Sequence, residues 1–159
     1  MTAALLDEQR KVTETFEEAH TIRAIAEELP DRHVRETLIR STDRMIAATI
    51  APVRVKIVTH VLHFDDKTIR RWVELGILPA VEEKPRLAVD PVRLFEVAEL
   101  VRALRARRYE RDFTNAVWSA LQDSAVLDDP QVRVALDQLA AGQRRRWTEN
   151  PDGSWGPAE

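Results

Sequence analysis

Apolar residues recur every three or four positions through the first fifty residues, and Pro30 interrupts the pattern. This spacing places them on one face of a helix on each side of the proline. Asp31 follows, where its side chain can cap the second helix. We therefore predict a helical hairpin over residues 1–52, whose two apolar faces need a covering partner. These faces consist of Val12, Phe16, Ala19, Ile22, Ala26, Leu29, Val34, Leu38, Met45, Ile46, Thr49 and Ile50.

In the middle of the chain the apolar positions form shorter groups separated by polar turns. The spacing predicts a helix over 53–63 and, after a three-residue turn, a second helix over 67–75. Gly76 ends the second helix, because glycine readily adopts the left-handed conformation found after helix C-termini. Two short strands, at 80–81 and 87–89, follow and are expected to form a hairpin.

Capping residues mark the starts of two helices in this region. Asp65 or Asp66 can accept hydrogen bonds from the free amides at the start of the helix over 67–75. Asp90 and Pro91 open another helix, because aspartate caps well and proline fits the first helical position. Its apolar face, which includes Leu94, Val97, Ala98, Val101 and Leu104, extends the helix to about residue 108.

Periodicity weakens after residue 111, where Phe113, Val117, Trp118 and Leu121 predict a further helix and Asp129-Pro130 opens another. We expect Trp118, like Trp72, in the core. From Gly142 onward, polar residues, glycine and proline predict a flexible tail. The chain thus divides into a hairpin over 1–52, a central unit over 53–111, C-terminal helices over 112–141 and a tail over 142–159.

The charge distribution distinguishes the central unit from its flanks. The whole chain has a net charge of −3, but residues 53–111 carry +4, against −3 before them and −4 after them. A positive middle suits a surface that binds phosphate, although so small an excess also arises by chance. The absence of cysteine excludes disulfides and thiol catalysis. No apolar run is long enough for a membrane span, and we expect no signal peptide and a cytoplasmic location.

Two helices joined by a short turn, with basic residues on the second, form the basic DNA-reading unit. Arginine can bind guanine through two hydrogen bonds, and lysine or threonine can bind phosphates. The same pattern also describes an ordinary amphipathic surface helix. The residues expected to face outward are Lys67, Thr68, Arg70, Arg71 and Glu74, whereas Ile69, Trp72 and Val73 are available to pack inward.

The stretch from Val58 to Pro79 resembles the MerR and excisionase-like winged-helix family. The resemblance rests on Lys67-Thr68-Ile69-Arg70-Arg71-Trp72, Gly76-Ile77-Leu78-Pro79 and the closing segment Arg86-Leu87-Ala88-Val89-Asp90-Pro91. It implies a mainly α fold with a winged helix-turn-helix and a short β-hairpin wing, flanked by the N-terminal helical hairpin and the C-terminal helices. It further implies that Lys67, Thr68, Arg70 and Arg71 face the DNA groove and its phosphates. Trp72 would brace the recognition helix or touch the DNA backbone, and Lys84 and Arg86 would lie on the wing.

Three features depart from that family pattern. His63 stands where the turn usually has glycine, Asp65 and Asp66 place negative charge at the start of the recognition helix, and Glu82 and Glu83 do so at the wing tip. Carboxylates repel phosphate, so binding per copy should be weak and a homodimer is expected. The N-terminal helical pair and the region after Arg102 are both candidates for the dimer contact.

No pattern in the sequence indicates an enzyme, a metal site or a cofactor. His60 and His63 share a helix face but lack further ligands in a suitable arrangement. Phosphate-binding glycine loops and nucleophile motifs are absent. We therefore expect neither catalytic residues nor a bound metal or cofactor.

Two hypotheses of function follow. The first is a sequence-specific regulator of transcription that binds double-stranded DNA, and one version of it is an antitoxin that represses its own operon. Trp147 and Trp155 in the tail, or the N-terminal helices, would then bind a toxin or another regulatory protein, because aromatic residues are favoured at interfaces. The alternative is a helical adaptor whose winged unit and tail recognise protein.

Overall fold

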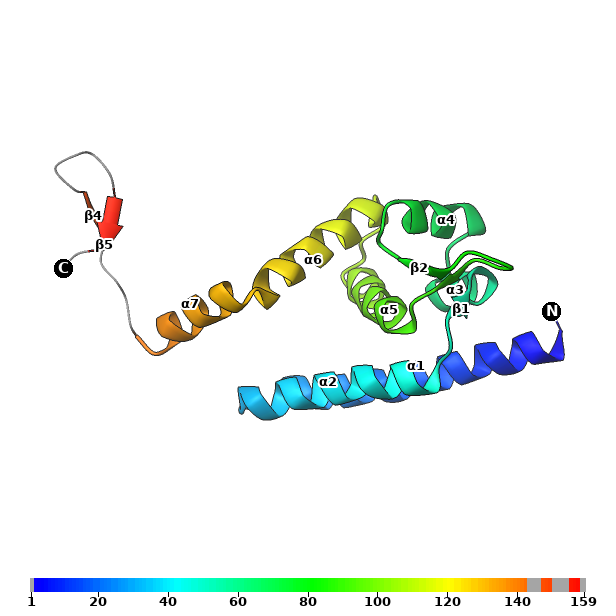
Figure 1. Ribbon diagram of the computed structural model, residues 1–159, viewed down its shortest axis with the longest axis horizontal. Helices are drawn as coiled ribbons and strands as arrows, with labels where there is room; N and C mark the ends of the chain where they lie inside the picture. The colour runs from blue at the N-terminus through cyan, green and yellow to red at the C-terminus, as the bar shows by residue number, and fades with distance from the viewer. Residues whose placement is uncertain (1, 143–146, 150–154, 158–159) are drawn as a thin grey trace. The chain divides into compact units, whose positions relative to one another are not determined.

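The computed structural model describes residues 2–142, 147–149 and 155–157. Contacts divide the chain into two compact units, residues 1–118 and 119–159, and each is described by itself. The described part is mainly helical, with seven α-helices, one small three-stranded antiparallel sheet and one pair of short strands (Figure 1). The expected mainly α architecture is therefore confirmed.

The first unit begins with the expected helical hairpin, formed by α1 (Ala3–Glu28) and α2 (Arg32–Thr49). α1 starts nine residues before the first apolar position used to predict it, because Thr2 caps it by accepting a hydrogen bond from the backbone N–H of Leu5. Asp31 caps α2 as predicted. Ala19 and Ala26 of α1 are completely buried, and α1 and α2 pack against each other over much of their length.

The central segment contains three strands and three helices. The helix predicted to begin near Val53 begins two residues later, at Val55, because Val53 and Arg54 form a strand that pairs antiparallel with Ala88 and Val89. The strand order in the sheet is β1-β3-β2. The elements are β1 (Val53–Arg54), α3 (Val55–Leu62), α4 (Asp66–Glu74), β2 (Ala80–Glu82), β3 (Ala88–Val89) and α5 (Pro91–Ala106).

The capping predictions in this segment are confirmed. Asp65 accepts a hydrogen bond from the backbone N–H of Thr68, and Asp90 accepts one from that of Arg93. Gly76 has a φ of +78°, the left-handed conformation expected after α4. The pairing of β2 with β3 shifts register between Ala80 and Glu82, which gives the hairpin an irregularity.

The core of the first unit lies between the hairpin, α5 and the helices of the central segment. Phe16 of α1 meets Phe95 of α5 edge to face, with ring centroids 5.2 Å apart. Trp72 of α4 is completely buried, as predicted, and its Nε1 donates a 2.9 Å hydrogen bond to the hydroxyl of Thr114. The prediction that Trp118 is a core residue is wrong, because Trp118 is 41% exposed while the adjacent Val117 is fully buried.

The second unit contains the rest of α6 (Phe113–Asp128), which begins in the first unit, followed by α7 (Pro130–Ala140). Two strands that the sequence did not predict follow in the expected tail. β4 (Trp147–Glu149) pairs antiparallel with β5 (Trp155–Pro157), and Glu149 lies opposite Trp155. The remainder of the tail lies outside the described residues. None of the helices described in either unit is both long and apolar enough to cross a membrane.

Candidate nucleic-acid interface

α4 buries one side and exposes a strongly polar side. Ile69 and Trp72 are completely buried, three residues apart, which fixes the rotation of the helix on the domain. Lys67, Arg70 and Arg71 are exposed on the remaining surface. The helix therefore presents three cations at a fixed orientation.

An aromatic cluster holds α4 and the turn before it in place. The ring of Phe64, in the turn, lies 5.0 Å from that of Trp72 and 5.5 Å from that of Phe113. The guanidinium of Arg105 lies over Phe64, 4.9 Å from the ring centroid, and donates a 2.7 Å hydrogen bond to the carbonyl of Leu62. The end of α3 and the start of α4 are thus attached to α5 and α6 through a single group of contacts.

The turn itself has a defined backbone conformation. His63, at the end of α3, has φ 55° and ψ 44°, the left-handed region in which glycine is usually found. Asp65 then caps α4, and its hydrogen bonds with the side chain and backbone of Thr68 lower the pKa of its carboxyl group below the usual value. Thr68 is therefore engaged in the cap.

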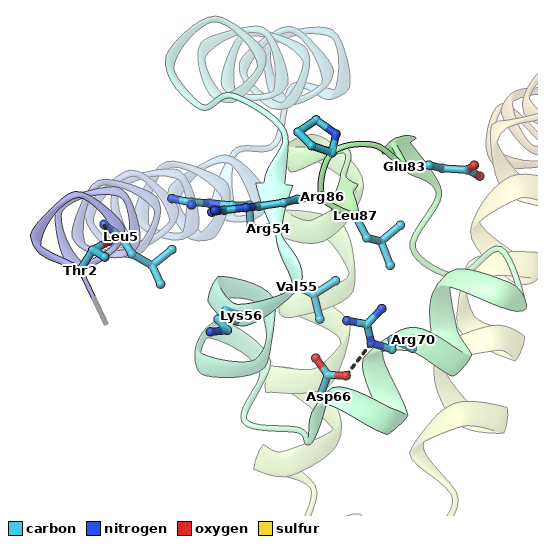
Figure 2. A pocket seen from close by; sticks show the side chains of 11 residues that line it. Thr2, Leu5, Arg54, Val55, Lys56, Asp66, Arg70, Glu83, Arg86 and Leu87 are labelled. Atoms are coloured by element: carbon cyan, nitrogen blue, oxygen red, sulfur yellow. Dashed lines mark hydrogen bonds and ion pairs between the residues drawn. The ribbon is translucent and has the colours of Figure 1, made fainter.

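A groove of about 1000 Å³ lies beside α4, between the hairpin of β2 and β3 and the start of α1 (Figure 2). Four cations from four different segments line it. Arg54 comes from β1, Lys56 from α3, Arg70 from α4, and Arg86 from the loop between β2 and β3. The other lining residues are Thr2, Leu5, Val55, Asp66, Glu83, Pro85 and Leu87.

Two of the four cations are neutralised by carboxylates within the chain. Arg70 donates to Asp66 at 2.5 Å, and both side chains are 55% exposed. Arg54 forms an ion pair with Glu8 of α1. Across the described residues, Lys56 and Arg86 have no such partner. The Glu83 carboxylate points away from the other lining side chains (Figure 2), so the groove keeps a positive excess.

The groove contains only part of the set of residues predicted from the sequence. It contains Arg70 and Arg86, whereas Lys67 and Arg71 lie on α4 without lining it, and Lys84 is exposed near the tip of the β-hairpin. Trp72 is fully buried and therefore braces α4 from behind. Of the two roles expected for this tryptophan, direct contact with a DNA backbone is excluded.

Sequence reasoning missed Arg54 and Lys56. They reach the groove because β1 pairs with β3, which places Arg54 opposite Ala88 and beside the hairpin of β2 and β3. A local signal exists, since Val53, Arg54, Val55 and Lys56 alternate between apolar and basic side chains, as in a strand with one buried face. The alternation covers only four residues, which is too short to distinguish a strand from the first turn of a helix.

Comparison with known proteins does not assign the chain to a family. No family model matches it, and neither a curated protein nor a solved structure matches it. Among the described residues, no group of three or more histidine, aspartate or glutamate side chains is arranged so that it could hold a metal ion.

Proposed function

We propose that residues 53–111 form a winged helix-turn-helix and that the protein is a sequence-specific, DNA-binding regulator of transcription. In this proposal α4 is the recognition helix, and the hairpin of β2 and β3 is the wing. The observation that carries it is the convergence of Arg54, Lys56, Arg70 and Arg86 from four segments on one groove beside α4.

The arrangement suits the two kinds of contact that a DNA-binding protein needs. Phosphate contacts supply most of the affinity and fix the orientation of the protein, and base contacts supply specificity. Lys67, Arg70 and Arg71 lie on the exposed surface of α4, where arginine can bind the major-groove edge of guanine. Lys56 and Arg86 have no carboxylate partner among the described residues, which supports a role for them in binding phosphates.

The acidic residues predict weak and selective binding. Asp66 competes with DNA for Arg70, and Glu8 competes for Arg54. These carboxylates lower the affinity of the protein for DNA of any sequence. The lost affinity is regained only on a sequence whose bases offer well-placed acceptors to the arginines. We therefore expect a modest affinity that depends strongly on the operator sequence.

Binding to the DNA upstream of the protein's own coding sequence, measured at two salt concentrations, tests the proposal. The double variant Arg70→Ala/Arg71→Ala should lose at least about tenfold in affinity, since one good arginine contact to a base contributes ~1–3 kcal/mol. The matched control is Arg40→Ala/Arg107→Ala, which removes two charges from exposed positions outside the groove. It should retain nearly full affinity.

A folded wild-type protein that binds no better than the double variant would contradict the proposal. The groove would then fit the second candidate function, a helical adaptor that recognises protein. That candidate is favoured by the apolar side chains of Leu5, Val55 and Leu87 in the groove, together with the carboxylates of Asp66 and Glu83. Pull-downs with and without nuclease separate the two functions, because an adaptor keeps its partner after nucleic acid is destroyed.

The antitoxin version of the regulator hypothesis stays a prediction. Trp147 and Trp155 lie at the starts of β4 and β5, and no described contact bears on whether they bind a toxin or another protein.

A further inference from the structure

The α1–α2 hairpin has two long sides, and only one of them is covered by the rest of the first unit. On the covered side, Phe16 contacts Phe95 of α5, and His20 lies 2.8 Å from the carboxylate of Glu99. Arg23 also lies on this side, with its guanidinium 5.2 Å from the centroid of the Phe95 ring. These contacts define the side of the hairpin that faces α5 (Figure 1).

The opposite side of the hairpin is apolar. An α-helix has 3.6 residues per turn. Ile22, Ile25 and Leu29 therefore lie on the flank of α1 that points away from Phe16 and His20. On α2, Asp43 lies on the covered side because it approaches Arg23. The flank of α2 opposite Asp43 carries Val34, Leu38 and Met45. Ile25 is 56% exposed and Val34 is 45% exposed, and they lie at the same level on the two helices. We call this surface the outer face; it consists of Ile22, Ile25, Leu29, Val34, Leu38 and Met45.

Within residues 2–118, the main partners of α1 and α2 are each other, α3 and α5, and the described contacts with α5 are made by the side that carries Phe16, His20 and Arg23. Ile22, Leu29, Leu38 and Met45 are only half-buried by the helix pair itself. Six large apolar side chains in a row on two adjacent helices form a continuous patch, and such patches mark interaction sites.

The charges around the outer face are arranged asymmetrically. α1 carries seven carboxylates against three cations, whereas α2 carries four arginines against two carboxylates. On the α1 edge of the outer face lie Glu14 and Glu18, and on the α2 edge lies Arg44, at the same level along the hairpin. All three are exposed.

We propose that the outer face binds the outer face of a second copy of this chain and forms an antiparallel four-helix bundle. Two twofold arrangements can stack these faces. One places α1 antiparallel to α1, where two helices that each carry seven carboxylates against three cations would face each other. The other places α1 against α2, where Glu18 of one copy faces Arg44 of the other. The charges select the second arrangement, because like charges across an interface are unfavourable.

This assembly depends only on residues of the hairpin and not on DNA binding. It resolves the choice between the two dimer candidates of the sequence in favour of the N-terminal helices. The molecular mass of the full-length chain in solution, measured by sedimentation equilibrium over a range of concentrations, tests it. The wild type should show the mass of two chains.

Two substitutions on the same turn of α1 provide the matched comparison. Ile25→Lys places a charge in the centre of the outer face and should weaken association by at least about tenfold, as substitutions at interface hot spots do. Ala24→Lys adds the same charge at an exposed position that points away from the outer face and should leave the mass unchanged. Far-UV circular dichroism should show that both variants keep the helical content of the wild type.

A charge exchange tests the pairing of α1 with α2. Glu18→Arg should weaken association, and Glu18→Arg/Arg44→Glu should restore it. A wild type that remains a single chain at all concentrations would overturn the proposal, as would an Ile25→Lys variant that still forms dimers. Failure of the double exchange to restore association would overturn it as well, because the α1-to-α2 arrangement requires that rescue.

Discussion

Helices α4 and α2 each bury only two side chains fully, yet they leave opposite kinds of surface uncovered. In α4 the buried pair is Ile69 and Trp72, and the remaining surface carries cations and carboxylates. In α2 the buried pair is Thr42 and Ile46, and one flank of the remaining surface is apolar. A charged uncovered face suits a polyanion, and an apolar one suits another pair of helices. The chemistry of what the fold leaves uncovered is thus a guide to what each helix binds.

The two regions also differ in how well their polar groups are satisfied. Around α4, Trp72 has a hydrogen-bond partner and Asp65 caps the helix. In the hairpin, Arg23 and Asp43 approach only to 3.7 Å, and Nε of Arg23 and Oδ1 of Asp43 are buried without a hydrogen-bond partner. The α4 region is therefore fixed by its own contacts, whereas the hairpin contains a polar pair that burial penalises.

The largest effect is expected from removing the tryptophan that anchors α4. Trp72→Ala should lower the free energy of unfolding by ~3–5 kcal/mol, because it leaves a cavity beside Phe64 and Thr114. Trp118→Ala is the matched control, and its cost should be much smaller because this side chain is 41% exposed. Chemical denaturation measures both. Equal losses would mean that α4 is not anchored as described.

A smaller loss is expected from removing the cap of α4. Asp65→Ala should lower the melting temperature by a few degrees, because the amide of Thr68 loses its acceptor. The pKa of Asp65 is lowered in the folded protein, so the stability that its ionised carboxylate contributes is present above the unfolded value of 3.8 and is lost in more acidic solution.

The melting-temperature difference between wild type and Asp65→Ala should therefore shrink as the pH falls through 4 and below. Asp65→Asn is the control, because asparagine also caps helices but does not titrate. If the melting-temperature difference between wild type and Asp65→Ala stayed constant down to strongly acidic pH, the negative charge of Asp65 would not contribute to the cap.

A further variant links the hairpin to the proposed DNA interface. Glu8→Gln removes the carboxylate that pairs with Arg54 and should raise the affinity for DNA by roughly two- to fivefold at low salt, the scale of a partly exposed ion pair. Glu28→Gln removes the same charge from the other end of α1 and should change the affinity far less. Equal affinities of the two variants and the wild type would separate Arg54 from the interface.

The smallest effect concerns the polar pair inside the hairpin. Burial raises the pKa of Asp43, Arg23 opposes this, and Glu96 adds to it. A raised pKa means that the ionised form is disfavoured in the folded state, so ionisation of Asp43 costs stability above its folded pKa. Asp43→Asn should consequently be as stable as the wild type or slightly more stable at pH 7, and any gain should vanish in acid. A clear loss at pH 7 would show that the contact with Arg23 outweighs burial.

Local chemistry in the sequence predicted most of the first unit. Asp31, Asp65, Asp90 and Gly76 fix helix ends through interactions within a few residues, so their positions could be predicted without knowledge of the fold. The apolar stripe over 12–29 predicted the helix α1 for the same reason, but it did not predict that Phe16 faces α5 while Ile22 and Leu29 lie on the opposite flank.

Features that depend on distant partners were missed. The strand at Val53 and Arg54 exists because of β3, more than thirty residues away, and the groove cations Arg54 and Lys56 were overlooked with it. A large apolar side chain predicts a core position for Trp118, but in α6 the adjacent Val117 is the residue that is fully buried, and Trp118 is left 41% exposed. The antiparallel pairing of β4 with β5 had no periodic signal in so short a segment.

The pair formed by Arg70 and Asp66 has a consequence for how the proposed interface would choose among sequences. Because the carboxylate is tethered one helical turn away, it acts as a competitor at a high effective concentration. A hydrogen bond from Arg70 to a single phosphate oxygen is little stronger than the one that Arg70 already makes to Asp66. Guanine instead has two adjacent acceptors, which can take two parallel hydrogen bonds from the guanidinium. If the proposed interface binds DNA, this exchange would set a threshold of affinity that a correct operator reaches and non-specific sites do not.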